Sequence, residues 1–291
     1  MTATTRPGRH ALACAILVAL IALLVVPGFV RPAEAATPTL DPANSTIATS
    51  SGSTPISGTI KYNNANDLVY VVIAVDPAGS SPSIGTPSAG SLTFASRCAI
   101  NGGTAGVYME SFYVVDSSAE SAGISISASF SGGAAATATM VAFAVTGVDA
   151  AAPFDPSLAS CPTGSTGTTL SSGTVTFSTT GTSDFVMGAA AVFGTALTGS
   201  IAVGSGYTSI TSSAGTTSQA AAEYLTTSTA ASQSVSFTFP TASVAWAMIG
   251  DALVNTGGVS NVPDLPFGAL PLALAVPVVY AIARRRRALG P

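Results

Sequence analysis

The chain is most unusual for what it has little of. Only 8% of its 291 residues are charged, and it has one histidine and three cysteines. Nucleic-acid binding requires clustered lysines and arginines that neutralise phosphates, and the nine basic residues here are too few and too dispersed to provide them. We therefore expect no nucleic-acid partner.

The single histidine, His10, lies in a segment that we expect to be removed on export. Without it, a Ser-His-Asp triad, a Cys-His pair and a histidine-ligated zinc are all excluded from the mature chain. We therefore expect no catalytic residues, no cofactor and no metal, and we predict that the protein is not an enzyme.

The charges that are present are segregated along the chain. Between residues 37 and 261 the two basic residues, Lys61 and Arg97, are outnumbered by eleven acidic residues, which gives this part a net charge of −9. Both ends of the chain are basic by contrast. An acidic middle segment is typical of a domain that stays soluble outside the cell.

The first 35 residues have the order of a secretory signal peptide. Arg6 and Arg9 precede an apolar run over residues 11–26, which a small-residue site, Ala33-Glu34-Ala35, follows. We predict cleavage after Ala35 and hence export. A retained helical anchor is the alternative for this N-terminal helix.

The C-terminal end also has three parts. A linker and motif over residues 256–268 precede an apolar segment over residues 269–283, and the tail over residues 284–291 is rich in arginine. A helix from Leu265 to Ala283 would be roughly 28 Å long, enough to cross a membrane. Arginines directly after a helix keep that end in the cytoplasm, so the acidic domain would face outward. The orienting residues are Arg284, Arg285, Arg286 and Arg287.

This tail resembles the sorting signal of PEP-CTERM-type bacterial surface proteins. In that family a Val-Pro-Glu-Pro-like motif precedes a short hydrophobic helix and an arginine cluster. The corresponding residues here are Val262, Pro263, Asp264, Leu265, Pro266, Phe267 and Gly268, with aspartate in place of glutamate. The resemblance implies a transmembrane C-terminal helix that an exosortase-like enzyme processes. A sortase-type signal and a plain single-pass anchor are the alternatives.

Between the two ends the sequence predicts an all-β ectodomain over residues 56–255, after a lead-in rich in Ser, Thr and Pro over residues 36–55. Apolar residues alternate with serine from Ile124 to Phe130, which is typical of a strand with one buried face. The runs 68–75 and 140–148 are almost continuously apolar, which indicates central strands covered on both faces.

The ectodomain contains an internal repeat of two blocks, residues 56–150 and 168–254. We predict that the blocks contribute strands to one double-layer β-sandwich, because each has too few strands for a sandwich of its own. Two small tandem sandwiches are the alternative. The matches are Asn66-Asp67-Leu68-Val69 with Ser183-Asp184-Phe185-Val186, Glu110 with Glu223, Phe130 with Phe239, and Met140 with Met248.

This patterning is similar to that of the jelly-roll-like β-sandwich ectodomains of secreted bacterial proteins. The resemblance covers most of residues 40–255 and implies no catalytic residues.

The acidic residues admit several interpretations. Glu110 and Glu223 are the obvious pair for glycosidase chemistry, but we favour the interpretation that they are duplicated structural residues held by hydrogen bonds. For Asp67 and Asp184, at the starts of predicted strands, we expect hydrogen bonds that close turns. Calcium binding remains an alternative for the acidic residues in loops and at strand ends: Asp76, Asp116, Glu120, Asp149 and Asp155.

Three aromatic residues could line a carbohydrate groove: Tyr207, Tyr224 and Trp246. For Trp246, which lies in an apolar strand, we favour a place in the core.

The two cysteines outside the signal peptide, Cys98 and Cys161, are expected to form a disulfide. Export places them in an oxidising compartment, where a lone pair of cysteines commonly bonds. Both residues are predicted to lie in loops, and the bond would tie the connector between the blocks to the first block.

From these features we expect a secreted, surface-tethered structural or adhesive protein of the cell envelope or extracellular matrix. Its partners would be the membrane, through the C-terminal helix, and envelope polysaccharide. The alternative is a carbohydrate-binding or carbohydrate-cleaving surface module.

Overall fold

The computed structural model describes residues 37–51, 55–76, 82–101, 106–132, 136–158, 171–240 and 245–255. All regular structure in these ranges is β-strand, so the predicted all-β class is confirmed. The predicted signal helix and C-terminal helix lie outside them. Within the described part of the chain, no helix has the length and hydrophobicity needed to span a bilayer.

The described ranges contain eighteen strands, which form five antiparallel sheets. The strands are β1 (Thr39–Ser51), β2 (Ile56–Ile60), β3 (Asp67–Asp76), β4 (Ser83–Ile84), β5 (Ser88–Ala89), β6 (Leu92–Thr93), β7 (Ala95–Asn101), β8 (Tyr108–Asp116), β9 (Ile124–Ala128), β10 (Phe130–Ser131), β11 (Thr137–Thr146), β12 (Ser172–Ser178), β13 (Phe185–Phe193), β14 (Ala202–Val203), β15 (Thr208–Ser212), β16 (Ser218–Thr226), β17 (Ser232–Thr238) and β18 (Ala245–Leu253).

Each block of the repeat builds one inner and one outer sheet, and β1, which lies in the segment expected to be only a lead-in, joins the inner sheet of the first block. Inner sheet 1 has the order β1-β11-β3-β8-β7, and outer sheet 1 has the order β2-β9-β5-β6. In the second block, inner sheet 2 has the order β15-β16-β13-β18, and outer sheet 2 has the order β12-β17-β14. The short pair β10-β4 completes the first block.

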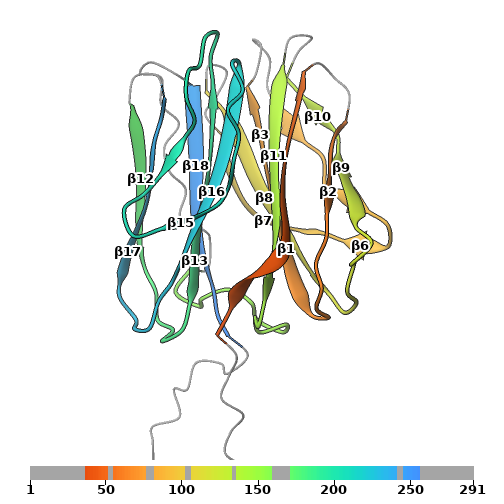
Figure 1. Cartoon of the computed structure of the whole chain (residues 1–291), viewed down its shortest axis with the longest axis vertical. Coiled ribbons are helices and arrows are strands. Elements are labelled where there is room, and N and C mark those ends of the chain that lie inside the picture. The colour runs from red at the N-terminus through yellow and green to blue at the C-terminus, as the bar shows by residue number, and fades with distance from the viewer. Residues whose placement is uncertain are drawn as a thin grey trace, which may run out of the picture. The chain divides into compact units, whose positions relative to one another are not determined.

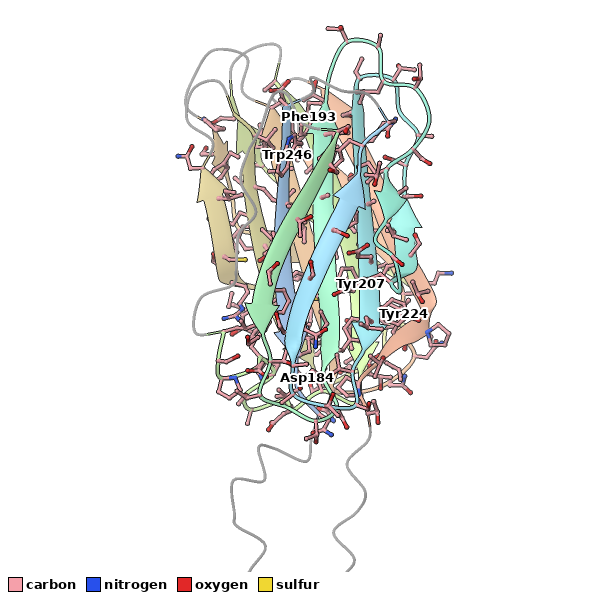
Figure 2. All side chains as sticks on the ribbon, turned by 90° about the vertical axis from the view of Figure 1, so that its left-hand side faces the viewer. Asp184, Phe193, Tyr207, Tyr224 and Trp246 are labelled. Atoms are coloured by element: carbon pink, nitrogen blue, oxygen red, sulfur yellow. The ribbon has the colours of Figure 1, made fainter. Side chains whose placement is uncertain are left out.

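The four sheets stack as layers, with the two inner sheets packed against each other (Figure 1). One face of β3, which includes Leu68 and Tyr70, joins the core shared with inner sheet 2. The opposite face, which includes Val69 and Val71, packs on outer sheet 1. β13, which runs from beside Asp184 to Phe193 (Figure 2), is likewise buried on both faces.

This stack differs from the predicted single double-layer sandwich. In a two-layer sandwich every strand keeps one face in water, so strands buried on both faces require at least three layers. The apolar runs correctly indicated burial on both faces. One face of each inner sheet is covered by the outer sheet of its own block, and the other face is covered by the inner sheet of the other block. The alternative of two sandwiches is closer to the structure, although the blocks share a core that tandem domains would not have.

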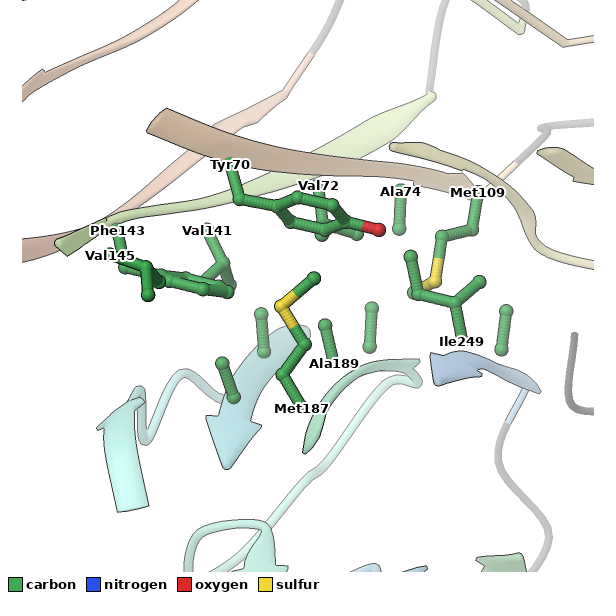
Figure 3. Close-up of a cluster of buried hydrophobic side chains, with 14 of the residues drawn as sticks. Tyr70, Val72, Ala74, Met109, Val141, Phe143, Val145, Met187, Ala189 and Ile249 are labelled. Carbon is green, nitrogen blue, oxygen red and sulfur yellow. The ribbon is translucent and has the colours of Figure 1, made fainter. Parts of the chain in front are cut away.

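That shared core holds aromatic side chains of both inner sheets. Figure 3 shows Tyr70 and Phe143 of inner sheet 1 lying over Met187, Ala189 and Ile249 of inner sheet 2. The small alanines of β13, β16 and β18 meet aromatic rings, and such alternation of small and large residues lets facing layers interdigitate.

Strand register tests the repeat directly. Met140 lies opposite Ile73 across β11 and β3, and Met248 lies opposite Ala190 across β18 and β13. Ile73 and Ala190 are each six residues after the repeated aspartate, Asp67 or Asp184. The match of Met140 with Met248 is therefore confirmed.

The match of Glu110 with Glu223 is wrong by two residues. Glu110 lies opposite Ile73, whereas the residue opposite the equivalent Ala190 is Ala221. Glu223 lies opposite Gly188 and therefore corresponds to Phe112 of the first block. A shift by two residues keeps a side chain on the same face of a strand, which is why the sequence pattern concealed it.

A glycine in β13 sets the distance between inner and outer sheet 2. A Cβ atom added to Gly188 would lie 2.1 Å from Cγ1 of Val235 in β17. We expect Gly188→Ala to lower the free energy of unfolding by about 1–3 kcal/mol, as overpacking a rigid core does. Urea denaturation measures the loss. Val235→Ala removes the obstructing methyl groups, so the double variant should lose less stability than the sum of the single variants; strict additivity would contradict this steric explanation.

Candidate functional site

The most polar part of the shared core is a cluster that joins the two blocks. Arg97 of β7 donates from Nε to Oδ2 of Asp251 in β18 (2.8 Å) and from Nη2 to Oδ1 (2.9 Å). Nη2 also donates to the carbonyl oxygen of Leu158 (2.7 Å), and the guanidinium lies 3.9 Å from the ring centroid of Phe154. Planar, bidentate geometry of this kind is the strongest form of an Arg–carboxylate pair.

A tyrosine and a serine complete this interblock cluster. Tyr70 donates to Oδ2 of Asp251 (3.2 Å) and lies 3.0 Å from Oγ of Ser111. Burial raises the pKa of Tyr70 well above its ordinary value, so the phenol stays protonated. Burial opposes the charge of Arg97, but Asp251 more than compensates and raises the pKa of the guanidinium. Burial raises the pKa of Asp251 in spite of Arg97, but the bidentate geometry is that of an ion pair, which links the two blocks.

A narrow gap lies beside the interblock cluster, between the inner sheets. It is lined by Tyr70, Phe143, Met187, Gly188, Ala189, Ile249, Gly250 and Asp251, and it is too narrow to hold a water molecule. The gap is a packing imperfection of the core and offers no room for a substrate.

Glu223 is a buried carboxylate between inner and outer sheet 2. Its Oε2 accepts from the backbone N–H of Gly204 (2.6 Å) and its Oε1 accepts from that of Ser236 (3.1 Å). Burial raises the pKa of Glu223 to about 7, although both N–H groups favour the ionised form. The side chain fixes the turn after β14 to β17 and β16, which is a structural role.

Glu110 has a different setting from Glu223. It accepts from Oγ of Ser96 (2.7 Å) and from the hydroxyl of Tyr108 (3.0 Å) in the first block. Burial and the charge of Glu110 raise the pKa of Tyr108 to about 12. The structure therefore places the two glutamates in separate blocks and in separate hydrogen-bond networks, and they do not form a carboxylate pair.

The three aromatic residues considered for a groove do not form one. Trp246 is 2% exposed and packs on Phe239 in the core between inner and outer sheet 2, as favoured from the sequence. Tyr224 stacks on Phe185 on the opposite face of inner sheet 2. Figure 2 places Trp246 toward one end of the domain and both Tyr207 and Tyr224 toward the other.

The exposed faces of both outer sheets carry rows of hydroxyl groups. On outer sheet 2, four Ser/Thr residues of β12 lie directly opposite four of β17, in the pairs Ser172–Thr238, Thr174–Ser236, Thr176–Ser234 and Ser178–Ser232. On outer sheet 1, the pairs are Ser57–Ser127, Thr59–Ser125 and Ser88–Thr93. The strands of both outer sheets contain no charged residue. The alternation from Ile124 to Phe130 predicted one exposed polar face, but it did not indicate that the polar residues of several strands form two such faces.

Several predicted sites lie outside the described residues. They are the cleavage site at Ala33 and Ala35, the sorting motif Val262–Gly268, the arginines Arg284–Arg287, and Cys161. Cys98 was predicted to lie in a loop but belongs to β7, with its Sγ 3.1 Å from Oγ of Ser111. The Cys98–Cys161 disulfide stays a prediction.

Among the described residues, no group of three or more His, Cys, Asp or Glu side chains is arranged to hold a metal ion. Both carboxylate oxygens of Asp155, which was considered for calcium, accept hydrogen bonds from backbone N–H groups.

Comparison with known proteins gives little further information. The chain matches no protein-family profile and no curated protein. Among solved structures, the ectodomain of ANX2 from Arabidopsis thaliana aligns at 9% identity over 75% of this chain and 94% of that chain, with a TM-score of 0.21. A score this low carries no argument about fold or function.

Proposed function

We propose that this chain is an exported, non-enzymatic adhesive or structural protein that is tethered at the cell surface by its C-terminal end. The observation that carries the proposal is the pair of charge-free hydroxyl faces on the outer sheets. Adjacent strands are about 4.8 Å apart and alternate residues about 6.8 Å apart, so each face is a regular array of groups that both donate and accept hydrogen bonds.

Such a face fits a neutral, hydroxyl-rich polysaccharide of the envelope or matrix. Sugar hydroxyls also donate and accept, and a neutral polymer needs no countercharge. The rest of the domain carries mainly acidic residues, which would repel acidic polymers.

The placement of the chain ends supports tethering. β1 begins and β18 ends at the same end of the domain, so a C-terminal anchor would leave the rest of the stack projecting from the surface (Figure 1). The signal peptide, the exosortase-like processing and the membrane helix belong to this proposal.

The sheet orders support a jelly-roll-like origin for each block. In the first block the chain crosses repeatedly between the two sheets: β1 is inner, β2 outer, β3 inner, β5 and β6 outer, β7 and β8 inner, β9 outer and β11 inner, while β4 and β10 form the separate short pair. We propose that the protein consists of two jelly-roll-like units packed through equivalent inner sheets.

Binding to an insoluble neutral glucan tests the adhesive function, with an acidic polyuronate as the comparison polymer. A variant with two lysines on each outer face, at Thr59, Ser125, Thr176 and Ser234, should bind the glucan at least about tenfold more weakly. The reason is that each ammonium group desolvated against a neutral polymer costs about 1–3 kcal/mol.

The matched control carries four lysines in and beside β15, away from both faces, at Thr208, Ser209, Ser212 and Thr216. It has the same net charge as the test variant and should bind like the unmodified protein. Equal binding by the two variants, or no binding by the unmodified protein, would contradict the proposal.

A further inference from the structure

The two blocks share a feature that the proposed function does not use: each block, taken together with the segment directly before it, has a pair of buried aspartates at the end where β1 begins and β18 ends. The first pair is Asp41 and Asp67, and the second is Asp155 and Asp184. Each of the four side chains is at most 1% exposed. Figure 2 shows Asp184 at this end of the second block.

Register shows that the two pairs are equivalent. Leu40, which precedes Asp41, lies opposite Val145 of β11, and Phe154, which precedes Asp155, bridges to Leu253 of β18. Val145 in turn lies opposite Leu68, the residue after Asp67, just as Leu253 lies opposite Phe185, the residue after Asp184. Both aspartates of the pair have therefore been kept in both copies of the repeat.

One member of each pair is held as an ionised acceptor. Asp155 accepts at Oδ1 from the backbone N–H of Ser157 (2.8 Å) and at Oδ2 from those of Thr180 (2.7 Å) and Gly181 (3.1 Å). The hydroxyls of Ser157 and Thr180 add further bonds. These donors lower the pKa of Asp155 in spite of its burial.

Asp41 also accepts hydrogen bonds. Its Oδ2 accepts from the backbone N–H of Asn63 (3.0 Å) and from Nδ2 of Asn64 (3.0 Å). Both bonds come from the segment between β2 and β3, so Asp41 fixes the start of β1 to that segment.

The other member of each pair is less well supplied with donors. Neither carboxylate oxygen of Asp67 has a hydrogen-bond donor in good geometry, and neither has Oδ2 of Asp184. An ionised carboxylate in this setting would be a buried, poorly compensated charge beside a second negative charge, and such a charge is costly. A protonated carboxyl group can instead donate to the neighbouring aspartate.

We propose that Asp67 and Asp184 each hold a proton that is shared with Asp41 and Asp155, so that the fold has one proton-binding carboxyl pair in each block. Each shared proton links two segments at this end of the domain. The first links β1 to β3, and the second links the segment after β11 to β13. Deprotonation leaves two adjacent negative charges and loosens this end of the domain.

The surroundings favour a proton over a cation. The groups around Asp41 and Asp155 are N–H and O–H donors, whereas calcium requires six to eight oxygen ligands. The described residues also contain no cluster of three or more acidic, histidine or cysteine ligands.

The electrostatic surroundings agree with the shared proton. Burial and then Asp41 raise the pKa of Asp67 to about 6, against the smaller opposing effects of Thr146 on β11 and the backbone of Asn64. Asp116 faces Asp67 from β8, bonded to the hydroxyl of Tyr62.

In the second block, burial and then Asp155 raise the pKa of Asp184 to about 6. Thr179 and the backbone of Gly181 oppose this shift. The remaining neighbour, Thr227, accepts from the backbone N–H of Asp184 at 3.2 Å.

The sign of the pH dependence follows from these shifts. The folded state holds the two protons up to about pH 6, whereas unfolded aspartates release theirs near pH 4. The stabilising contribution is therefore fully present below about pH 4 and is lost as the pH rises through about 6.

The test compares the unmodified protein with Asp67→Asn/Asp184→Asn by thermal unfolding from pH 4.5 to 8. An asparagine amide donates to Asp41 or Asp155 as the acid does, but it does not titrate. We expect the melting temperature of the unmodified protein to fall across pH 5–7 and that of the variant to fall less. The proton uptake linked to folding near pH 5.5 should be smaller by about one proton per pair.

Two control variants distinguish the titration of the aspartate pairs from that of other carboxyl groups. Glu223→Gln removes the group that titrates near pH 7 and should leave the change around pH 6 intact. Glu120→Gln removes a carboxylate outside the pairs and should leave the whole profile unchanged. A double-asparagine variant with the same pH profile as the unmodified protein would overturn the proposal.

The unmodified protein provides a test that does not depend on the variants' folding. Carbon-13 NMR of the carboxyl groups, with the signals assigned to residues, should show Asp67 and Asp184 still protonated at pH 5. Finding both of them ionised at that pH would refute the shared protons. A rise in melting temperature on addition of calcium at pH 7.5, reversed by EDTA and absent in Asp67→Asn, would identify a cation site instead and would also overturn the proposal.

Discussion

Replacing Arg97 by methionine is expected to lower the free energy of unfolding by about 3–5 kcal/mol, because it leaves Asp251 as an unpaired charge in the core between the blocks. Asp251 is 1% exposed and receives both of its charged hydrogen bonds from Arg97. Methionine keeps the apolar length of the side chain, so the loss reports mainly on the ion pair. Urea denaturation at pH 7 measures it.

A double-mutant cycle assigns that loss to the pair itself. Asp251→Asn removes the stranded charge, so the double variant should be more stable than Arg97→Met alone. Tyr70 keeps Ser111 as a partner in both variants. If Arg97→Met unfolds at the same urea concentration as the unmodified protein, or if the two losses simply add, the interblock cluster does not couple the blocks.

Trp246→Ala is expected to cost about 3–5 kcal/mol, the usual loss when a large aromatic ring is removed from a packed core. Trp246 is among the largest fully enclosed side chains and packs beside Phe239 between inner and outer sheet 2. Chemical denaturation, followed by circular dichroism, measures the loss.

Trp246→Phe is the matched control, because it keeps a ring in the same space. Trp246→Phe should lower the free energy of unfolding by clearly less than Trp246→Ala, since the indole N–H has no hydrogen-bond partner to lose. Trp246 is also the chain's one tryptophan, so its fluorescence reports directly on this site. If the emission is red-shifted and changes when glycan is added, Trp246 is not packed in the core, and a carbohydrate groove is favoured instead.

Some sequence predictions depended only on local pattern, and these are the ones the structure confirms. The all-β class followed from period-two alternation, and the repeat followed from matches such as Met140 with Met248. The burial of β3 on both faces followed from its continuous apolar run. The pattern was less informative for Glu110 and Glu223, because a two-residue slip in register preserves the face of a strand.

By itself, the sequence determined that this chain forms antiparallel strands in two related blocks with apolar central strands, because strand periodicity and burial are written into neighbouring residues. Only the tertiary structure decided that the inner sheets pack on each other, that Arg97 meets Asp251 from 154 positions away, and that Asp67 and Asp184 each lie beside a second aspartate. The physical reason is that two sheets pack according to the fit between their whole faces. The spacing of apolar residues along one strand carries no information about that fit.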